Sequence, residues 1–123
     1  MGLRTISKQE LDKIIENHKK WLQSNGEEGE RADLRYANLS YADLSYADLD
    51  FSAFPLWCGG LDVHIDDKQA TQLLYHFVKN VQYSKNTSAK LKRICKIKSL
   101  VKQANDFHRV NECGKIEITE KGK

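Results

Sequence analysis

Residues 32–56 repeat with a period of five, and this run constrains the fold more than any other part of the chain. It consists of five consecutive pentapeptides: ADLRY, ANLSY, ADLSY, ADLDF and SAFPL. Each block opens with Ala or Ser and has Leu or Phe at its centre. A period of five matches neither the 3.6 residues per turn of an α-helix nor the two-residue alternation of a strand. The run therefore predicts a repeat architecture that returns every fifth residue to the same environment.

This run resembles the pentapeptide-repeat family, whose motif is Ala-(Asp or Asn)-Leu followed by two variable residues. Its first four blocks carry that triplet in register, and the match covers about a fifth of the chain. The resemblance implies a right-handed quadrilateral β-helix, in which each block forms one side and four blocks form one coil. The repeat core would consist of the central residues Leu34, Leu39, Leu44, Leu49 and Phe54. Stacked repeats bury their core against neighbours, so an array of about one coil needs caps from the rest of the chain.

An aromatic residue closes each of the first four blocks, and the implied fold turns these residues outward: Tyr36, Tyr41, Tyr46 and Phe51. Exposed rings around a single coil would leave a large apolar surface in water. Either flanking helices cover the rings or a partner protein does. We therefore treat the three tyrosines as candidate partner-binding residues.

Acidic or amide residues occupy the second position of the first four blocks: Asp33, Asn38, Asp43 and Asp48. Some longer members of the family use such residues to mimic duplex DNA and inhibit topoisomerases. That function requires a long rod with acidic residues in a column. Here each of the four would lie on a different side, and the run is too short and too weakly acidic for mimicry.

Residues 7–24 are predicted to form an amphipathic helix that caps the array. Ser7 and Glu10 have the spacing of a capping box, and Gly26 allows a left-handed end. His18 lies within the apolar stripe of this helix, which favours a structural role. We predict a capping helix and connector at 1–30, a repeat coil at 31–57 and a helical capping region at 58–123. Together these parts would form a single compact α+β domain.

The C-terminal region contains apolar patterns that predict further elements. Residues 61–65 favour a strand, and residues 67–82 favour a helix in which Tyr75 faces outward. The apolar face of that helix would consist of Ala70, Leu73, Leu74, Phe77, Val78 and Val81. Ser88 is the expected N-cap of one continuous helix over 89–104. Ile116 and Ile118 alternate in a tail at 115–119 that favours a short strand.

Seven basic residues and no acidic residue lie between Lys85 and Lys102. The candidate partner-binding residues on this segment are Lys92, Arg93, Lys96 and Lys98. A solvated helix face, contact with an acidic protein and contact with nucleic acid are three alternatives. Nucleic acid is the less favoured partner, because the whole chain has a net charge of only +3 and no aromatic residue lies among the lysines to stack on bases.

Composition and motifs argue against several classes of function. Apolar residues make up 40% of the chain, yet no stretch approaches the ~18 apolar residues of a membrane span, and the N-terminus lacks the apolar core of a signal peptide. Cys58, Cys95 and Cys113 are odd in number and far apart, so we expect reduced, mostly buried thiols. No spacing indicates a metal site, a cofactor site or a catalytic constellation. We therefore expect a cytoplasmic, non-enzymatic protein without cofactors.

Short pentapeptide arrays flanked by helical segments resemble small accessory proteins of phages and prophages. The resemblance implies a phage protein that acts in the infected host cell as a host-defence inhibitor. Its target would be a bacterial protein such as a CRISPR or restriction nuclease, which makes it an anti-CRISPR or anti-restriction type of inhibitor. Two alternatives are a structural, dimerising protein of unknown partner and a nucleic-acid-binding module that uses the basic segment 85–102. We also expect a weak homodimer or a target-bound complex, because a short array leaves an open edge.

Overall fold

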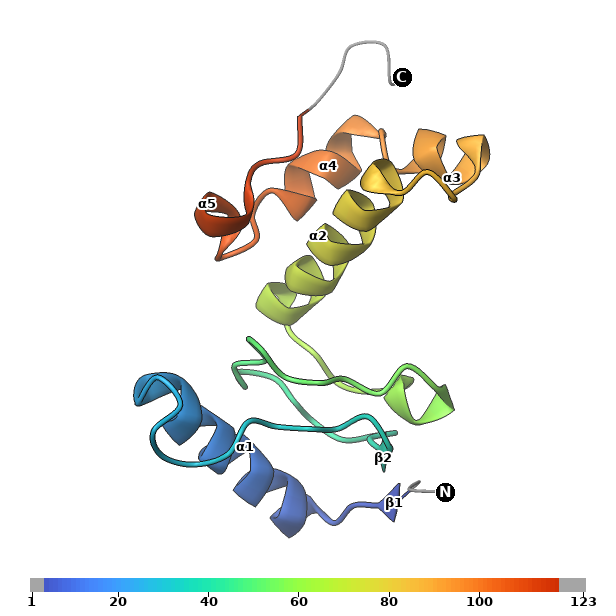
Figure 1. Ribbon diagram of the computed structural model, residues 1–123. Helices are drawn as coiled ribbons and strands as arrows, with labels where there is room; N and C mark the ends of the chain where they lie inside the picture. Colours follow the sequence, from blue (N-terminus) through green and yellow to red (C-terminus); the bar gives the residue numbers. More distant parts are fainter. Residues whose placement is uncertain (1–3, 118–123) are drawn as a thin grey trace. The chain divides into compact units, whose positions relative to one another are not determined.

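The computed structural model describes residues 4–117 and falls into two compact units (Figure 1). Unit 1 ends at Asp66, and unit 2 begins at Asp67. The predicted boundary after residue 57 therefore lies inside unit 1, and the predicted C-terminal region 58–123 is shared between the two units. The chain thus has two compact units where the sequence suggested one, and each unit has its own core of buried apolar residues.

Unit 1 contains β1 (Arg4–Thr5), α1 (Lys8–Gln23), β2 (Ala37–Asn38) and the short 3-10 helix η1 (Cys58–Gly60). The predicted N-terminal helix is confirmed, and it begins with the expected capping box. Ser7 Oγ accepts a hydrogen bond from the Glu10 N–H at 3.1 Å, and the Glu10 carboxylate accepts one from the Ser7 N–H at 3.3 Å. Gly26 follows the helix in the left-handed region, with φ 91°.

Each of the first four pentapeptides of the run ends in a turn, which explains the period of five. The N–H that opens a block donates to the carbonyl oxygen of the central Leu of the preceding block, at 2.8–3.0 Å in four successive places. Within each of the first four blocks, the second side chain accepts a hydrogen bond from the N–H two residues later, at 2.9–3.2 Å. Asp and Asn are favoured at this position because their short side chains close the local ring.

The first three blocks of the run are also hydrogen-bonded to a later part of the chain. The N–H groups of three central leucines donate to carbonyl oxygens 19 or 20 positions later, at 2.7–2.8 Å: Leu34 to Ala53, Leu39 to Gly59 and Leu44 to His64. Strand pairing in the described residues is nevertheless limited to the parallel pair β1–β2 and to isolated bridges at Asp33 and Asp43. The backbone of the run is therefore held by turns and single bridges.

The predicted α+β fold built on a quadrilateral β-helix is wrong. Helix accounts for 47% of the structure and strand for 6%, and no continuous sheet lines the run within residues 4–117. The physical reason is local: each of the first four blocks ends in a turn, so the one strand within the run extends over only two residues. The predicted strand at 61–65 does not form either, and His64 makes only an isolated bridge.

The core of unit 1 packs α1 against the inward residues of the run. Leu34, Leu39 and Leu44 are at most 1% exposed. Phe54 packs against this cluster while only partly buried, and Leu49 is also partly buried. The predicted repeat core is thus confirmed as fully buried for its first three leucines.

The His18 side chain connects α1 to the first and the fourth block of the run by hydrogen bonds. It is 2% exposed, its Nδ1 accepts a hydrogen bond from the Ala32 N–H at 3.0 Å, and its Nε2 lies 2.7 Å from the Asp50 carbonyl oxygen. A ring nitrogen that accepts from an N–H carries no proton, so Nε2 carries it and donates to Asp50. The structural role predicted for His18 is therefore supported.

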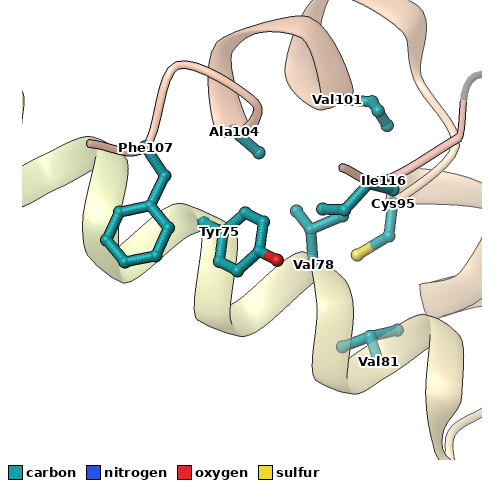
Figure 2. Close-up of a cluster of buried hydrophobic side chains, with 8 residues drawn as sticks. All are labelled: Tyr75, Val78, Val81, Cys95, Val101, Ala104, Phe107 and Ile116. Atoms are coloured by element: carbon teal, nitrogen blue, oxygen red, sulfur yellow. The ribbon is translucent and has the colours of Figure 1, made fainter. Parts of the chain in front are cut away.

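Unit 2 contains α2 (Asp67–Tyr83), α3 (Ala89–Ile94), α4 (Lys98–Ala104) and α5 (Val110–Cys113). Ser88 caps α3 as predicted and accepts the Leu91 N–H at 3.1 Å. The Phe107 ring stacks on the Tyr75 ring with 4.7 Å between their centroids. The core lies between α2 and the later segments, and its buried residues are Tyr75, Val78, Val81, Cys95, Val101, Ala104, Phe107 and Ile116 (Figure 2).

The predicted continuous helix at 89–104 is wrong, because a turn over residues 95–97 separates α3 from α4. Cys95 and Val101 are both buried, but a straight helix would place residues six positions apart about 120° from each other around its axis. The turn brings both side chains into one core. Ile97 leaves the helical region with ψ 124°, and the Gln82 amide donates to the Cys95 carbonyl oxygen at 2.8 Å.

The buried face of α2 differs from the predicted face. Tyr75, expected outside, is 2% exposed, and its hydroxyl donates to the Gly114 carbonyl oxygen at 2.5 Å. Leu73 and Phe77, expected inside, are 43% and 50% exposed. Apolar residues surround most of this helix, so the pattern alone does not decide which stripe is buried. The later segments of unit 2 decide it by offering Tyr75 a stacking partner and an acceptor.

The segment around Ile116 is held in place by the Asn105 side chain and not by strand pairing. Asn105 accepts a hydrogen bond from the Ile116 N–H and donates one to the Ile116 carbonyl oxygen, both at 2.8 Å. The predicted strand over 115–119 does not form in its described part, residues 115–117, and Ile118 lies outside the described residues.

Candidate functional site

Three aromatic residues of the run are exposed on unit 1, and we call them the aromatic ledge: Tyr41, Tyr46 and Phe51. Their side chains are 80%, 95% and 60% exposed. The alternative in which flanking helices cover the rings is therefore wrong for Tyr41 and Tyr46, whereas the Phe51 ring contacts Trp21 of α1. Tyr36 is 46% exposed, and the Arg35 guanidinium lies 5.5 Å from the centre of its ring.

The backbone of the aromatic ledge is strained. Tyr41, Tyr46 and Phe51 have φ values of 68°, 70° and 63°, the left-handed region that bulky residues rarely enter. Each occupies the third position of its turn, where a positive φ favours Gly or Asn. A left-handed residue with a Cβ costs roughly 1–2 kcal/mol. Stability alone therefore favours small residues at three positions where the chain carries large, exposed rings.

A recess lies beside each of the two tyrosines of the ledge. Tyr41 borders a hollow of ≈ 380 Å³ that is also lined by Ile6, Lys8 and Asp12. Tyr46 borders a hollow of ≈ 220 Å³ that is also lined by Ile15, Lys19 and Leu22. Both recesses lie between α1 and the run, and unit 1 as a whole carries 7 basic and 12 acidic residues. The ledge therefore offers rings and adjoining recesses on an acidic unit.

The acidic residues at the second positions serve the turns. Hydrogen bonds from the Arg35 side chain, with Nε at 2.9 Å and Nη2 at 2.8 Å, lower the pKa of the Asp33 carboxyl. Hydrogen bonds from Ser45, chiefly its backbone N–H at 2.9 Å, lower the pKa of the Asp43 carboxyl. These carboxylates therefore have a structural reason to be present that is unrelated to mimicry of DNA.

The four basic candidates on unit 2 do not share one environment. The Lys92 ammonium donates to the carbonyl oxygens of Val81 at 2.8 Å and Gln82 at 3.4 Å, and also to that of Ser84. It therefore binds the carbonyl groups at the C-terminus of α2, which gives it a structural role, and its role in partner binding stays a prediction. Arg93, Lys96 and Lys98 are exposed and form no ion pair within residues 4–117.

Replacing Lys92 with Met is expected to lower the free energy of unfolding of unit 2 by about 1–3 kcal/mol, because carbonyl groups at the end of α2 lose a charged donor. Lys96→Met removes the same charge from an exposed position and is expected to change it by less than about 0.5 kcal/mol. Urea titration followed by circular dichroism at 222 nm measures both variants. Equal stability of the two variants would contradict this role for Lys92.

Comparison with family models, with curated proteins and with solved structures finds no match to this chain.

The thiols are distributed differently from the prediction. Cys95 is buried, and this burial raises the pKa of its thiol, whereas Cys58 and Cys113 are exposed. The expectation of mostly buried cysteines is therefore wrong for two of the three. Among residues 4–117, no helix has the length and apolar character needed to cross a membrane.

The sequence identified Tyr41 and Tyr46 as candidates by their repeat position, and the same position could have identified Phe51. The Phe51 ring meets the Trp21 ring edge-on with 6.1 Å between centroids, which connects the ledge to α1. The positive φ angles had no signal in the sequence, because Tyr and Phe are unfavourable in that region.

Proposed function

We propose that this chain is a non-enzymatic protein-binding module whose contact surface is the aromatic ledge of unit 1. The observation that carries the proposal is the combination of strain and exposure at Tyr41, Tyr46 and Phe51. Buried aromatic residues can recover a backbone cost through packing, but the Tyr41 and Tyr46 side chains are 80% and 95% exposed. Tyr is enriched among the few residues that dominate binding energy at protein interfaces. A partner that buries the rings would offset both the strain and the exposed apolar surface.

The chemistry of the ledge favours a partner with protruding apolar side chains surrounded by Lys and Arg. The recess beside Tyr41 contains Asp12 and Asp43, and the recess beside Tyr46 contains Asp48. Apolar side chains of the partner would enter the recesses, while its basic groups would approach these carboxylates. Complementary charge of this kind raises association rates and excludes acidic partners.

The identity of the partner rests on the resemblance of residues 32–56 to pentapeptide repeats and of the chain to phage accessory proteins. We accordingly propose a bacterial defence nuclease of the CRISPR or restriction type as the target. Proteins that bind nucleic acid present basic surfaces to phosphates, and such surfaces are complementary to an acidic unit. A second copy of this chain is the competing occupant of the ledge.

The proposal predicts that Tyr41→Asn/Tyr46→Asn loses binding without losing stability. Asn tolerates the left-handed region, so the melting temperature should stay the same or rise. Affinity should fall by at least about 30-fold, the effect of removing interface residues worth 2 kcal/mol or more. Biolayer interferometry against a panel of purified CRISPR effector and restriction nucleases measures the affinity.

Leu56→Asn is the matched control, because Leu56 is 98% exposed and lies outside the ledge. Unchanged binding by the double variant would overturn the ledge as the contact surface. Failure of the wild-type chain to bind any nuclease of the panel would overturn the proposed target class. A dimer in sedimentation that the double variant loses would assign the ledge to a second copy instead.

A further inference from the structure

The two units of the chain carry net charges of opposite sign. Unit 2 holds 13 basic and 5 acidic residues, a net charge of +8, whereas unit 1 has a net charge of −5. The whole-chain value of +3 therefore hides a strongly basic compact unit. The low net charge of the whole chain argued against nucleic acid as a partner. Unit 2 by itself carries more than twice that positive charge.

Unit 2 carries five exposed cations on α3, on α4, in the turn between them and in the segment after α5, and we call this set the basic face: Arg93, Lys96, Lys98, Lys102 and Lys115. Lys98 and Lys102 are four positions apart on α4 and therefore lie on the same side of it. Val101 and Ala104 of the same helix are buried, whereas both lysines are exposed. Lys96 lies in the turn between α3 and α4, two residues before the start of α4.

A hollow of ≈ 690 Å³ brings Lys115 into this set. Lys102 and Lys115 both line it, together with Ser99 and Asn105. The bidentate hydrogen bonds between Asn105 and the backbone of Ile116 fix the C-terminal segment at this place. Lys115 is therefore held beside α4 by the fold, although thirteen positions separate it from Lys102.

The basic face is largely uncompensated within the described part of the chain. None of its five cations forms an ion pair there, whereas Arg109, elsewhere in unit 2, pairs with Glu112 at 2.7 Å. Among residues 4–117, Asp106 is the only acidic residue that lines the hollow. Unpaired, exposed cations keep mobile anions near them, and a polyanion gains free energy by displacing those ions.

We propose that the basic face binds the phosphate backbone of double-stranded nucleic acid without sequence preference. The cations are spread over α3, the turn and α4, as a continuous chain of phosphates requires, rather than gathered around one acidic side chain. Residues 84–106 contain no Phe, Tyr or Trp that could stack on the bases of a single strand. A duplex, which hides its bases and presents its phosphates, therefore fits this face better than a single strand.

Fluorescence anisotropy with a labelled 20-base-pair DNA duplex, from 50 to 300 mM NaCl, tests the proposal on the full chain. Contact with about four phosphates gives a log–log salt slope of about −3.6. Lys98→Gln/Lys102→Gln should reduce the slope by about 1.8 and weaken binding at 100 mM NaCl by at least about 10-fold. Lys13→Gln/Lys20→Gln removes the same charge from exposed positions of α1 and should leave both quantities nearly unchanged.

Three results would overturn the proposal. The first is no measurable binding of the wild-type chain at 100 mM NaCl. The second is an equal loss in both double variants, which would show that net charge alone is responsible. The third is equal competition by polyglutamate at matched charge concentration, which would assign the face to acidic proteins. The Tyr41→Asn/Tyr46→Asn variant should retain duplex binding, so this test is independent of the aromatic ledge.

Discussion

Leu44→Asp is expected to unfold unit 1 while unit 2 keeps its helices. Leu44 is 1% exposed and belongs to the cluster that joins α1 to the run. Removing a buried leucine costs about 2–5 kcal/mol, and a carboxylate in its place adds the cost of burying a charge. A loss of more than about 5 kcal/mol would exceed the whole stability of many small domains.

The chain provides a selective readout for this experiment, because its two tryptophans, Trp21 and Trp57, both lie in unit 1. Tryptophan emission should shift to the value of the denatured protein, whereas part of the helical circular dichroism signal should remain. Leu56→Asp introduces the same charge at a residue that is 98% exposed and should leave the emission unchanged. Native emission from Leu44→Asp would show that the core of unit 1 is described wrongly.

Gly29→Ala is expected to lower the free energy of unfolding of unit 1 by about 3 kcal/mol or more, at the upper end of ordinary single substitutions. A Cβ at Gly29 would lie 2.2 Å from the Asn17 carbonyl oxygen of α1 and 2.9 Å from Lys20 Cβ. The residue also has φ 70°, which an alanine adopts only at a cost. The segment around Gly29 would therefore have to move away from α1.

Gly26→Ala is the matched control, because Gly26 also has a positive φ but its Cβ would meet nothing closer than 3.6 Å, at Trp21. This control should lose only the conformational cost of about 1 kcal/mol. Urea titration followed by tryptophan emission measures both variants. Equal losses would show that backbone conformation, rather than the contact with α1, explains the need for Gly29.

The parts of the fold that could be predicted are those determined by neighbours in sequence. Ser7 and Ser88 begin helices because each accepts an N–H three residues later, and that spacing is visible in the sequence. The buried leucines of the run follow from the period of five. The tyrosine candidates follow from it too, since their repeat position places them on the outside.

The parts that could not be predicted depend on contacts between distant residues. Tyr75 faces inward because Phe107 and Gly114 offer it a ring and an acceptor, and α2 itself gives no sign of this. Lys92 resembles its basic neighbours in sequence, yet only its ammonium reaches the end of α2. The quadrilateral β-helix was inferred from a five-residue motif, and that motif determines only the turns. The extent of strand pairing depends on the length of the neighbouring chain that is available to pair with the run.

The hydrogen bonds that join the run to the chain 19 or 20 positions later have a consequence for insertions and deletions. Adding one pentapeptide in the middle of the run would preserve every local turn but move each later acceptor one block away from its donor. Adding four pentapeptides would keep every donor about twenty positions before an equivalent acceptor, although some of the pairs would be new. Natural variation in the length of this segment should therefore occur in steps of about twenty residues, and a chain that gained only five would have to form these hydrogen bonds with different partners.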